Sequence, residues 1–249
     1  MKIALCFSGQ PRYVERCAPL ILKHLIQDYE MDVFAHLWFD EQLTQAPFKV
    51  DDTGNWENQT ISKNAISIFK QCYQPKAIKV ESSKSFSDPD LFVDRARSEK
   101  MFWSNGSNDP MLAVREINNS LSYFYSLNAV LTLLKLHEYE HNFKYDWVIR
   151  CRTDCEIHEP IRLVEYDPNV LNCTSLRQRP PFINDWLNFG NTNVMEGFMG
   201  IFPIVRNVIR GTKEKYEGGW CIELVHTHML EFLNIPVCRH PIEITLPRF

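Results

Sequence analysis

No part of the 249-residue sequence approaches the ~20 consecutive apolar residues of a membrane-spanning helix, so we expect no membrane span. Only 9 residues are glycine and 14 are proline, while 45% are hydrophobic and 23% are charged, values that exclude collagen-like and disordered chains. An excess of positive charge is also missing, because 27 Lys and Arg residues face 31 Asp and Glu, a net charge of −4. Nucleic acid, which attracts basic proteins, is therefore not an expected partner.

Paired cysteine motifs are absent too. The eight cysteines include no Cys-x-x-Cys and lie far apart in a chain long enough to bury a core without disulfides. Cys151 and Cys155, four residues apart, give only weak support for zinc. Residues 1–7 form a short apolar run without a small-residue cleavage site, which is typical of a strand and not of a signal peptide. We therefore expect reduced cysteines and a soluble, cytoplasmic protein.

Apolar runs and helical periodicity alternate through the first third of the sequence. Residues 2–7 and 32–38 are almost continuously apolar, as expected of strands that are covered on both faces. Residues 13–28 carry apolar side chains at helical spacing, which predicts a β-α-β unit with parallel strands. A helix at 61–73 and a strand at 77–80 continue the alternation. The expected fold class is α/β, with a central, mostly parallel sheet flanked by helices.

The middle of the sequence changes composition. Residues 82–119 are rich in Ser, Asp, Asn, Arg and Pro, which predicts a long mobile insertion of the kind that often serves function. Strong helical periodicity returns at 121–139, and a further helix is predicted at 220–233. No repeat and no clear linker divides the chain, so we expect a single domain over residues 1–249.

Charged residues follow an apolar entry in the segment 146–155. If this segment is one strand, Arg150, Arg152 and Asp154 lie on the same face near its carboxyl end, where open α/β sheets bind ligands. Arginines suit phosphate groups and carboxylates suit divalent cations. A surface cluster of salt bridges that includes Glu156 would give the same pattern, so both interpretations stay open.

A second candidate follows the first predicted strand, in the sequence Phe-Ser-Gly-Gln-Pro-Arg. Gly9 would let backbone approach a ligand closely, and Arg12 offers a phosphate or carboxylate partner near a helix start. Neither the Gly-x-Gly-x-x-Gly fingerprint nor the Gly-x-x-x-x-Gly-Lys-Ser/Thr phosphate loop is present, which disfavours dehydrogenases and kinases. A plain strand-to-helix turn explains Gly9 about equally well.

Two further segments contain candidate catalytic groups. Asp185 stands in an aromatic and Asn-rich stretch predicted to be a loop, where it could act as a base or simply cap a helix or form an Asx turn. The helix at 220–233 carries Glu223, His226 and His228. A spacing of two places the histidines on different faces, so a two-histidine metal site is not expected.

Taken together, these motifs resemble those of a known family. The order Phe-Ser-Gly-Gln-Pro-Arg, Tyr-Asp-Trp-Val-Ile-Arg-Cys-Arg-Thr-Asp, Ile-Asn-Asp-Trp-Leu-Asn-Phe-Gly-Asn and a late helix with Glu223 and His228 resembles GT-A-fold nucleotide-sugar glycosyltransferases. The small soluble enzymes of viruses and of bacterial surface-polysaccharide loci are the most similar. The resemblance implies that Ser8, Gly9 and Arg12 flank the nucleotide.

The resemblance also implies roles for the acidic residues. Asp154 stands where the last acid of the Asp-x-Asp metal motif stands, and Asp185 lies by the acceptor. The first position of that motif is Arg152, which leaves open whether Mn²⁺ or Mg²⁺ at Asp154, or the arginines themselves, neutralise the diphosphate.

The resulting expectation is an enzyme that moves a hexosyl or deoxyhexosyl group from a nucleotide-sugar donor to a glycan hydroxyl. Ser8, Gly9, Arg12, Arg150, Arg152 and Asp154 would bind the donor, Asp185 would take the acceptor proton, and Glu223 and His228 are further candidates. A nucleotidyltransferase is one alternative, although a first loop richer in Gly and Lys or Arg would be expected. A non-catalytic binding module for sugar nucleotides or glycans is another.

Overall fold

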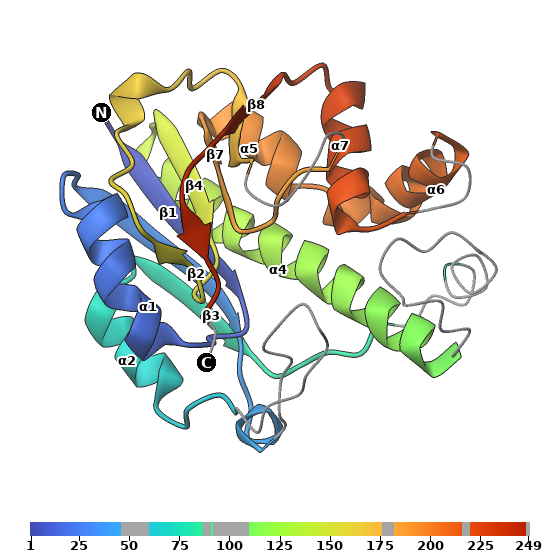
Figure 1. The fold of residues 1–249 in the computed structure, drawn as a ribbon, viewed down its shortest axis with the longest axis horizontal. Helices are drawn as coiled ribbons and strands as arrows, with labels where there is room; N and C mark the ends of the chain where they lie inside the picture. Colours follow the sequence, from blue (N-terminus) through green and yellow to red (C-terminus); the bar gives the residue numbers. More distant parts are fainter. Residues whose placement is uncertain (46–59, 87–90, 92–109, 176–181, 216–219, 248–249) are drawn as a thin grey trace.

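The computed structural model describes residues 1–45, 60–86, 91, 110–175, 182–215 and 220–247. A seven-stranded sheet lies at the centre, with strand order β3-β2-β1-β4-β7-β6-β8 (Figure 1). Only β7 runs against the others, so the sheet is mostly parallel. The strands are β1 (Ile3–Gly9), β2 (Met31–Trp38), β3 (Ala77–Glu81), β4 (Trp147–Cys151), β6 (Leu171–Thr174), β7 (Leu187–Gly190) and β8 (Val237–His240). A separate antiparallel pair joins β5 (Glu156–Ile157) to β9 (Ile244–Thr245).

Helices cover both faces of the sheet (Figure 1). One face carries α1 (Val14–Ile21), which continues as a π-helical turn at Leu22–Ile26, and α2 (Ala65–Tyr73). The other carries α4 (Pro110–His141), α5 (Thr192–Met199) and α7 (Ile222–Phe232), with α6 (Val205–Lys215) packed on α7. Short 3₁₀ turns lie at Gln42–Thr44, Leu163–Glu165 and Phe202–Ile204.

The alternation of side chains along β1 explains this three-layer arrangement. Leu5 and Phe7 enter the core under α1 and α2, whereas Ala4 and Cys6 enter the core under α4 and α5. Since every one of these side chains is fully buried, β1 can only be a central strand. A third apolar cluster joins the first half of α4 to α6 and α7.

The order of connections creates a crevice beside β1. From β1 the chain steps through α1 to β2 and through α2 to β3, always outward on one side. It then returns along α4 to β4, on the other side of β1. Right-handed crossovers that run in opposite directions place their helices on opposite faces, as α1 and α4 are. The carboxyl ends of β1 and β4 therefore flank the point where ligands bind in such sheets.

Most predicted elements are confirmed, and several boundaries are wrong. The predicted strand at 146–155 ends at Cys151, because residues 153 and 154 form a turn. The helix predicted at 121–139 begins at Pro110, so residues 110–119 of the expected insertion are helical. Ile117 is buried and extends the apolar stripe by one turn. Residues 87–90 and 92–109 of that insertion lie outside the described residues.

The expected loop around Asp185 contains β7, because the residues 187–190 pair with β4 and β6. All eight cysteines are free. Among the described helices, none combines the length and the apolar character that crossing a membrane would require.

Candidate functional site

A cavity of about 320 Å³ opens at the crevice between the carboxyl ends of β1 and β4. Residues from the ends of β1, β2 and β4, from the loop before β7 and from α4 form its walls. The cavity brings together all seven residues to which the sequence assigned donor binding or catalysis: Ser8, Gly9, Arg12, Arg150, Arg152, Asp154 and Asp185. Its volume lies in the range of small-molecule sites.

The turn after β1 supplies a glycine and an oriented arginine. Gly9 has a φ angle of +114°, which residues with a Cβ rarely adopt. A Cβ built at this position would meet no atom within 4 Å. Arg12 donates to Gln10 Oε1 from Nε at 2.8 Å and from Nη2 at 2.5 Å. The Thr153 hydroxyl donates to the Gln10 carbonyl at 3.0 Å, which fixes this turn to the loop after β4.

Arg150 is a buried cation at the floor of the cavity. Its side chain is 1% exposed, its Nε donates to the Ser8 hydroxyl at 3.2 Å, and its guanidinium carbon lies 5.3 Å from the centre of the Tyr123 ring. Its Nη1 is buried without a hydrogen-bond partner, and no carboxylate of the described residues pairs with it. A buried charge without a counter-ion is costly, so this position favours an anionic ligand.

Arg152 lies between two carboxylates. It donates from Nε and Nη2 to the two oxygens of Asp154, both at 2.8 Å, and from Nη1 to Asp185 Oδ2 at 3.2 Å. Burial alone would raise the pKa of Asp154, but the charge and hydrogen bonds of Arg152 and the charge of Arg12 outweigh it and lower that pKa. Asp154 is therefore ionised at neutral pH, and Arg152 is held in one orientation.

Asp185 lies in a turn that the side chain of Asn184 stabilises. Asn184 Oδ1 accepts from the Trp186 amide at 2.7 Å, which is the Asx turn that the sequence left open for Asp185. Asp185 is thereby free to face Arg152, and within the described chain no other hydrogen bond reaches its carboxylate. Oδ1 of Asp185 is consequently available to a ligand.

Of the two further candidates in α7, only Glu223 lies near the cavity. Its charge contributes to the raised pKa of Tyr123, although burial is the larger cause. His228 Nε2 would lie 2.6 Å from a Cβ built at Gly211, so His228 packs against α6. His226 instead contacts the cavity wall, because its Nε2 lies 3.0 Å from the Tyr123 hydroxyl. Burial, and then Arg150, lower the pKa of His226, so it is neutral.

A divalent cation at Asp154 would need oxygen ligands turned toward it. Both oxygens of Asp154 already accept from Arg152, and Asp185 shares the same guanidinium. In the part of the chain that the structure describes, no group of three or more His, Cys, Asp or Glu could hold a metal. In this arrangement the residues do not fit the Mn²⁺ or Mg²⁺ that the resemblance implies.

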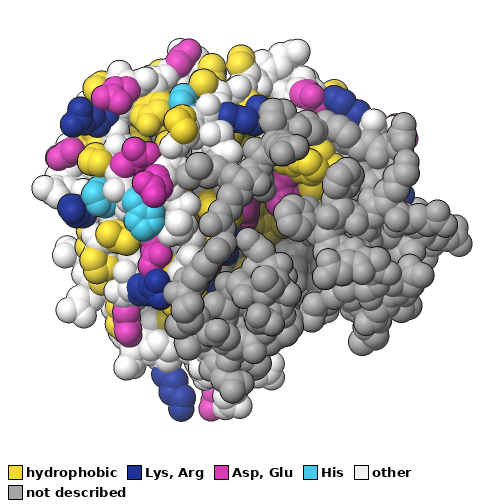
Figure 2. Space-filling model, viewed as in Figure 1, with side chains coloured by type: hydrophobic (Ala, Val, Ile, Leu, Met, Phe, Trp, Pro, Cys, Tyr) yellow, Lys and Arg dark blue, Asp and Glu magenta, His cyan; other side chains and the backbone are white. Residues whose placement is uncertain are grey.

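The basic character of the cavity is local. On the face shown in Figure 2, in the part that is coloured, Lys and Arg side chains are interspersed with Asp and Glu. The whole chain carries a net charge of −4. Clustering of arginines at the crevice therefore reflects a site and not a generally basic surface.

Comparison with protein families finds one match, which covers the middle of the chain. The family described as a domain of unknown function, DUF7796, matches residues 67–199, which is more than half of the chain. The chain belongs to this family. No curated protein matches the sequence. The DUF7796 segment runs from α2 to α5 and includes Arg150, Arg152, Asp154 and Asp185.

The pocket of this DUF7796 protein also has a wall that the sequence did not predict. The first half of α4 lines it with small polar side chains and one tyrosine: Asn118, Asn119, Ser122, Tyr123 and Ser126. Asn118, Ser122 and Ser126 follow one another at intervals of four residues, a polar stripe that helical periodicity could have revealed.

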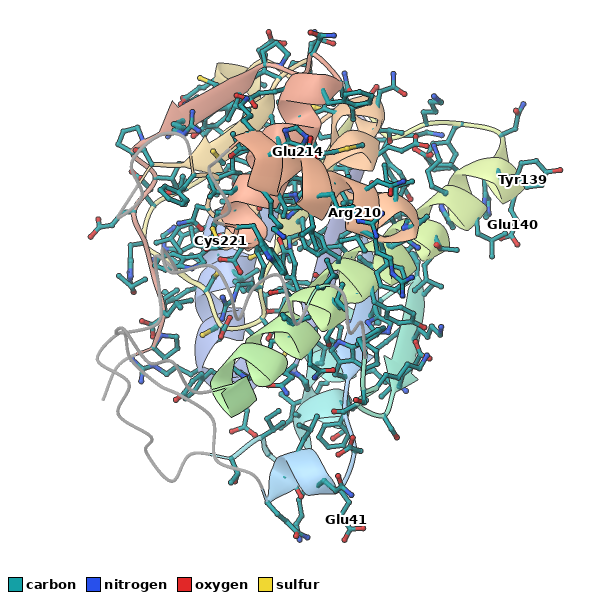
Figure 3. All side chains as sticks on the ribbon, turned by 90° about the vertical axis from the view of Figure 1, so that its right-hand side faces the viewer. Glu41, Tyr139, Glu140, Arg210, Glu214 and Cys221 are labelled. Carbon is teal, nitrogen blue, oxygen red and sulfur yellow. The ribbon has the colours of Figure 1, made fainter. Side chains whose placement is uncertain are left out.

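In Figure 3, α6 and α7 lie over α4, and the carboxyl end of α4 projects outward with Tyr139 and Glu140.

A second unpredicted wall comes from the ends of β2 and β3. Trp38 and Lys84 line the cavity, and Trp38 stacks on Tyr125 with ring centres 5.3 Å apart. Glu81 fixes this wall, because its carboxylate accepts from Lys84 at 2.5 Å, from the Tyr125 hydroxyl at 3.0 Å and from Lys79 at 2.8 Å.

Proposed function

We propose that this DUF7796 protein is a glycosyltransferase of GT-A type that moves a sugar from a nucleotide-sugar donor to a glycan hydroxyl. The observation that carries the proposal is Arg150, which is buried without a carboxylate partner in the described chain and lines a cavity at the carboxyl ends of β1 and β4. A diphosphate supplies the anion that such an arginine lacks. The mostly parallel sheet with helices on both faces is compatible with this fold type.

The residues have separate roles in this proposal. Ser8 and Gly9 let the donor approach the end of β1, and Arg12, Arg150 and Arg152 complement its phosphates. The bond between the anomeric carbon and the phosphate oxygen breaks, and its electron pair leaves with the nucleoside diphosphate. Guanidinium groups that are fixed before the reaction stabilise the negative charge that develops on that oxygen.

Asp185 is the group proposed to activate the acceptor. For an inverting transfer, the acceptor oxygen attacks the anomeric carbon from the side opposite the leaving group and gives its proton to Asp185 Oδ1. The ion pair with Arg152 holds Asp185 in place while Oδ1 stays available. Asp154 has a different task, since it orients Arg152 through two hydrogen bonds.

A turnover assay with a panel of nucleotide sugars and simple glycan acceptors tests the proposal. We expect release of a nucleoside diphosphate together with a glycosylated acceptor. Release of pyrophosphate from a nucleoside triphosphate and a sugar phosphate would instead identify a nucleotidyltransferase, which attacks phosphorus. Binding of sugar nucleotides without any turnover would identify a non-catalytic binding module.

A further inference from the structure

We infer that the pocket binds the diphosphate of its donor without a divalent cation, because Arg152 occupies the place that the cation would take. The inference rests on the proposed function and specifies its cofactor requirement. Arg12 and Arg150 complete the set of groups that face the phosphates.

Arg152 already occupies the carboxylate of Asp154. Nε and Nη2 of Arg152 satisfy both carboxylate oxygens at 2.8 Å, and the Asp154 side chain is only 9% exposed. A cation that bound Asp154 would have to displace this fork. It would also have to push a guanidinium away from Asp185, the second carboxylate that Arg152 contacts.

The charged groups of the cavity lining also disfavour a cation. Lys84 is offset by Glu81, which lies outside the cavity lining. Among the described residues of the lining, the other charged groups are the arginines Arg12, Arg150 and Arg152 and the carboxylates Asp154 and Asp185. Arg150 is buried without a carboxylate partner in the described chain, so its charge would repel an added divalent cation and attract a diphosphate.

The arginines offer hydrogen-bond donors in a geometry that suits phosphates. A guanidinium presents several N–H groups in one plane, which suits two phosphate oxygens at once. Arg150 has the clearest free capacity, because Nη1 is buried and has no partner. Arg152 is oriented by two carboxylates, so its plane is set before any ligand binds. Both features replace what a cation would supply, namely fixed positive charge beside the leaving oxygens.

Calorimetric titration of the whole chain tests this inference. The probes are the diphosphates of uridine, guanosine, cytidine and adenosine, each with EDTA, with Mn²⁺ and with Mg²⁺. We expect at least one to bind in EDTA, with an affinity that either metal changes by less than about threefold. Binding that requires metal, or that metal strengthens about tenfold or more, would overturn the inference and leave the proposed function standing. Absence of binding under every condition would overturn both.

Variants separate the carboxylate from the arginine. Asp154→Asn loses one negative charge and one of the two hydrogen bonds that orient Arg152, but no cation site, so it should change the diphosphate affinity by the same factor in EDTA and with metal. Arg150→Met should weaken diphosphate binding about 100-fold or more while the affinity for the matching nucleoside stays unchanged. Arg162→Met, an exposed arginine paired with Glu165, is the control for lost charge and should leave both affinities unchanged. If Asp154→Asn binds the diphosphate more weakly than the native chain with metal but not in EDTA, Asp154 holds a cation and the inference is wrong.

Discussion

Arg152 donates from Nε to Oδ1 and from Nη2 to Oδ2 of Asp154, both at 2.8 Å, so that the two side chains form a planar fork just after β4. The fork closes a turn of the backbone and leaves Nη1 to reach Asp185. A single guanidinium thereby joins the loop after β4 to the loop before β7. In the sequence, these two loops belong to separate motifs.

Replacement of Asp185 tests its role as the base. Asp185→Asn keeps the shape of the side chain but cannot take a proton, so we expect turnover to fall by about 100-fold or more. Donor affinity should stay nearly unchanged, because Arg152 remains fixed by Asp154. Steady-state kinetics and calorimetry provide the two measurements.

The matched control for Asp185 is Asp146→Asn. Asp146 lies at the other end of β4, where its carboxylate accepts from the Lys2 amide at 2.7 Å. This variant should keep full turnover. If Asp185→Asn retains native turnover while it remains folded, Asp185 has only a structural role.

Arg150 is expected to reduce stability in the absence of ligand. Arg150→Met replaces a buried guanidinium with an apolar side chain of similar length, so the free energy of unfolding should rise by about 1–3 kcal/mol. Urea unfolding of the native and variant proteins measures the difference. A loss of stability of similar size would show that Arg150 is structural and would remove the main support for an anion site.

The sequence predicted the central strands well, for a physical reason. The strands β1 and β2 are almost entirely buried, and burial on both faces makes them nearly continuous apolar runs. It missed β6, β7 and β8, which are four residues long and contain polar residues. Asn188 in β7, for example, is buried because its Nδ2 donates to the Asn184 carbonyl. A side-chain hydrogen bond of this kind does not produce a periodic pattern of apolar residues, so the sequence gives no sign of the strand.

The sequence predicts the site in outline, although the strand on which this prediction depends is shorter than expected. Alternation along a strand placed Arg150, Arg152 and Asp154 on one face, but the strand ends before Arg152. These residues still meet because a turn folds Asp154 back onto Arg152, and alternation does not encode that turn. The contact between Tyr123 and His226 joins residues 103 positions apart, so only the tertiary structure reveals it.

Gly9 offers a test of where the donor passes. Gly9→Ala should cost about 1–3 kcal/mol of stability, because φ of +114° is strained for any residue with a Cβ. The new methyl group would stand in open space, so a ligand that crosses Gly9 should bind at least about tenfold more weakly. Unchanged nucleotide affinity in a folded variant would place the donor elsewhere.

Glu81, which fixes the cavity wall at Trp38 and Lys84, should make the free energy of unfolding depend on pH. Burial would raise the pKa of Glu81, but hydrogen bonds from Lys79, Lys84, His36 and Tyr125 outweigh it and hold that pKa well below the ordinary 4.5. Because the pKa of Glu81 is lower in the folded chain than in the unfolded chain, ionised Glu81 stabilises the fold. This stabilisation is complete above pH 4.5 and is lost as the pH falls toward the folded pKa.

Glu81→Gln is the variant that measures this contribution. We expect it to reduce the free energy of unfolding by an equal amount at neutral pH and at about pH 5.5, and by less at about pH 3.5. Glu165→Gln, in an exposed pair with Arg162, should show little difference at any of these values. If Glu81→Gln lowers the free energy of unfolding by the same amount at all three pH values, ionised Glu81 does not stabilise this wall.

Thermal unfolding with nucleotides tests the central claim, that the crevice beside β1 is a nucleotide-sugar site. A ligand that binds only the folded chain raises its melting temperature, and saturation at 100 times Kd is worth about 2.7 kcal/mol. We expect a nucleoside diphosphate to raise the melting temperature of the native protein, NAD to have no effect, and Arg150→Met to abolish the shift. A rise with NAD and with no nucleoside diphosphate would contradict the account.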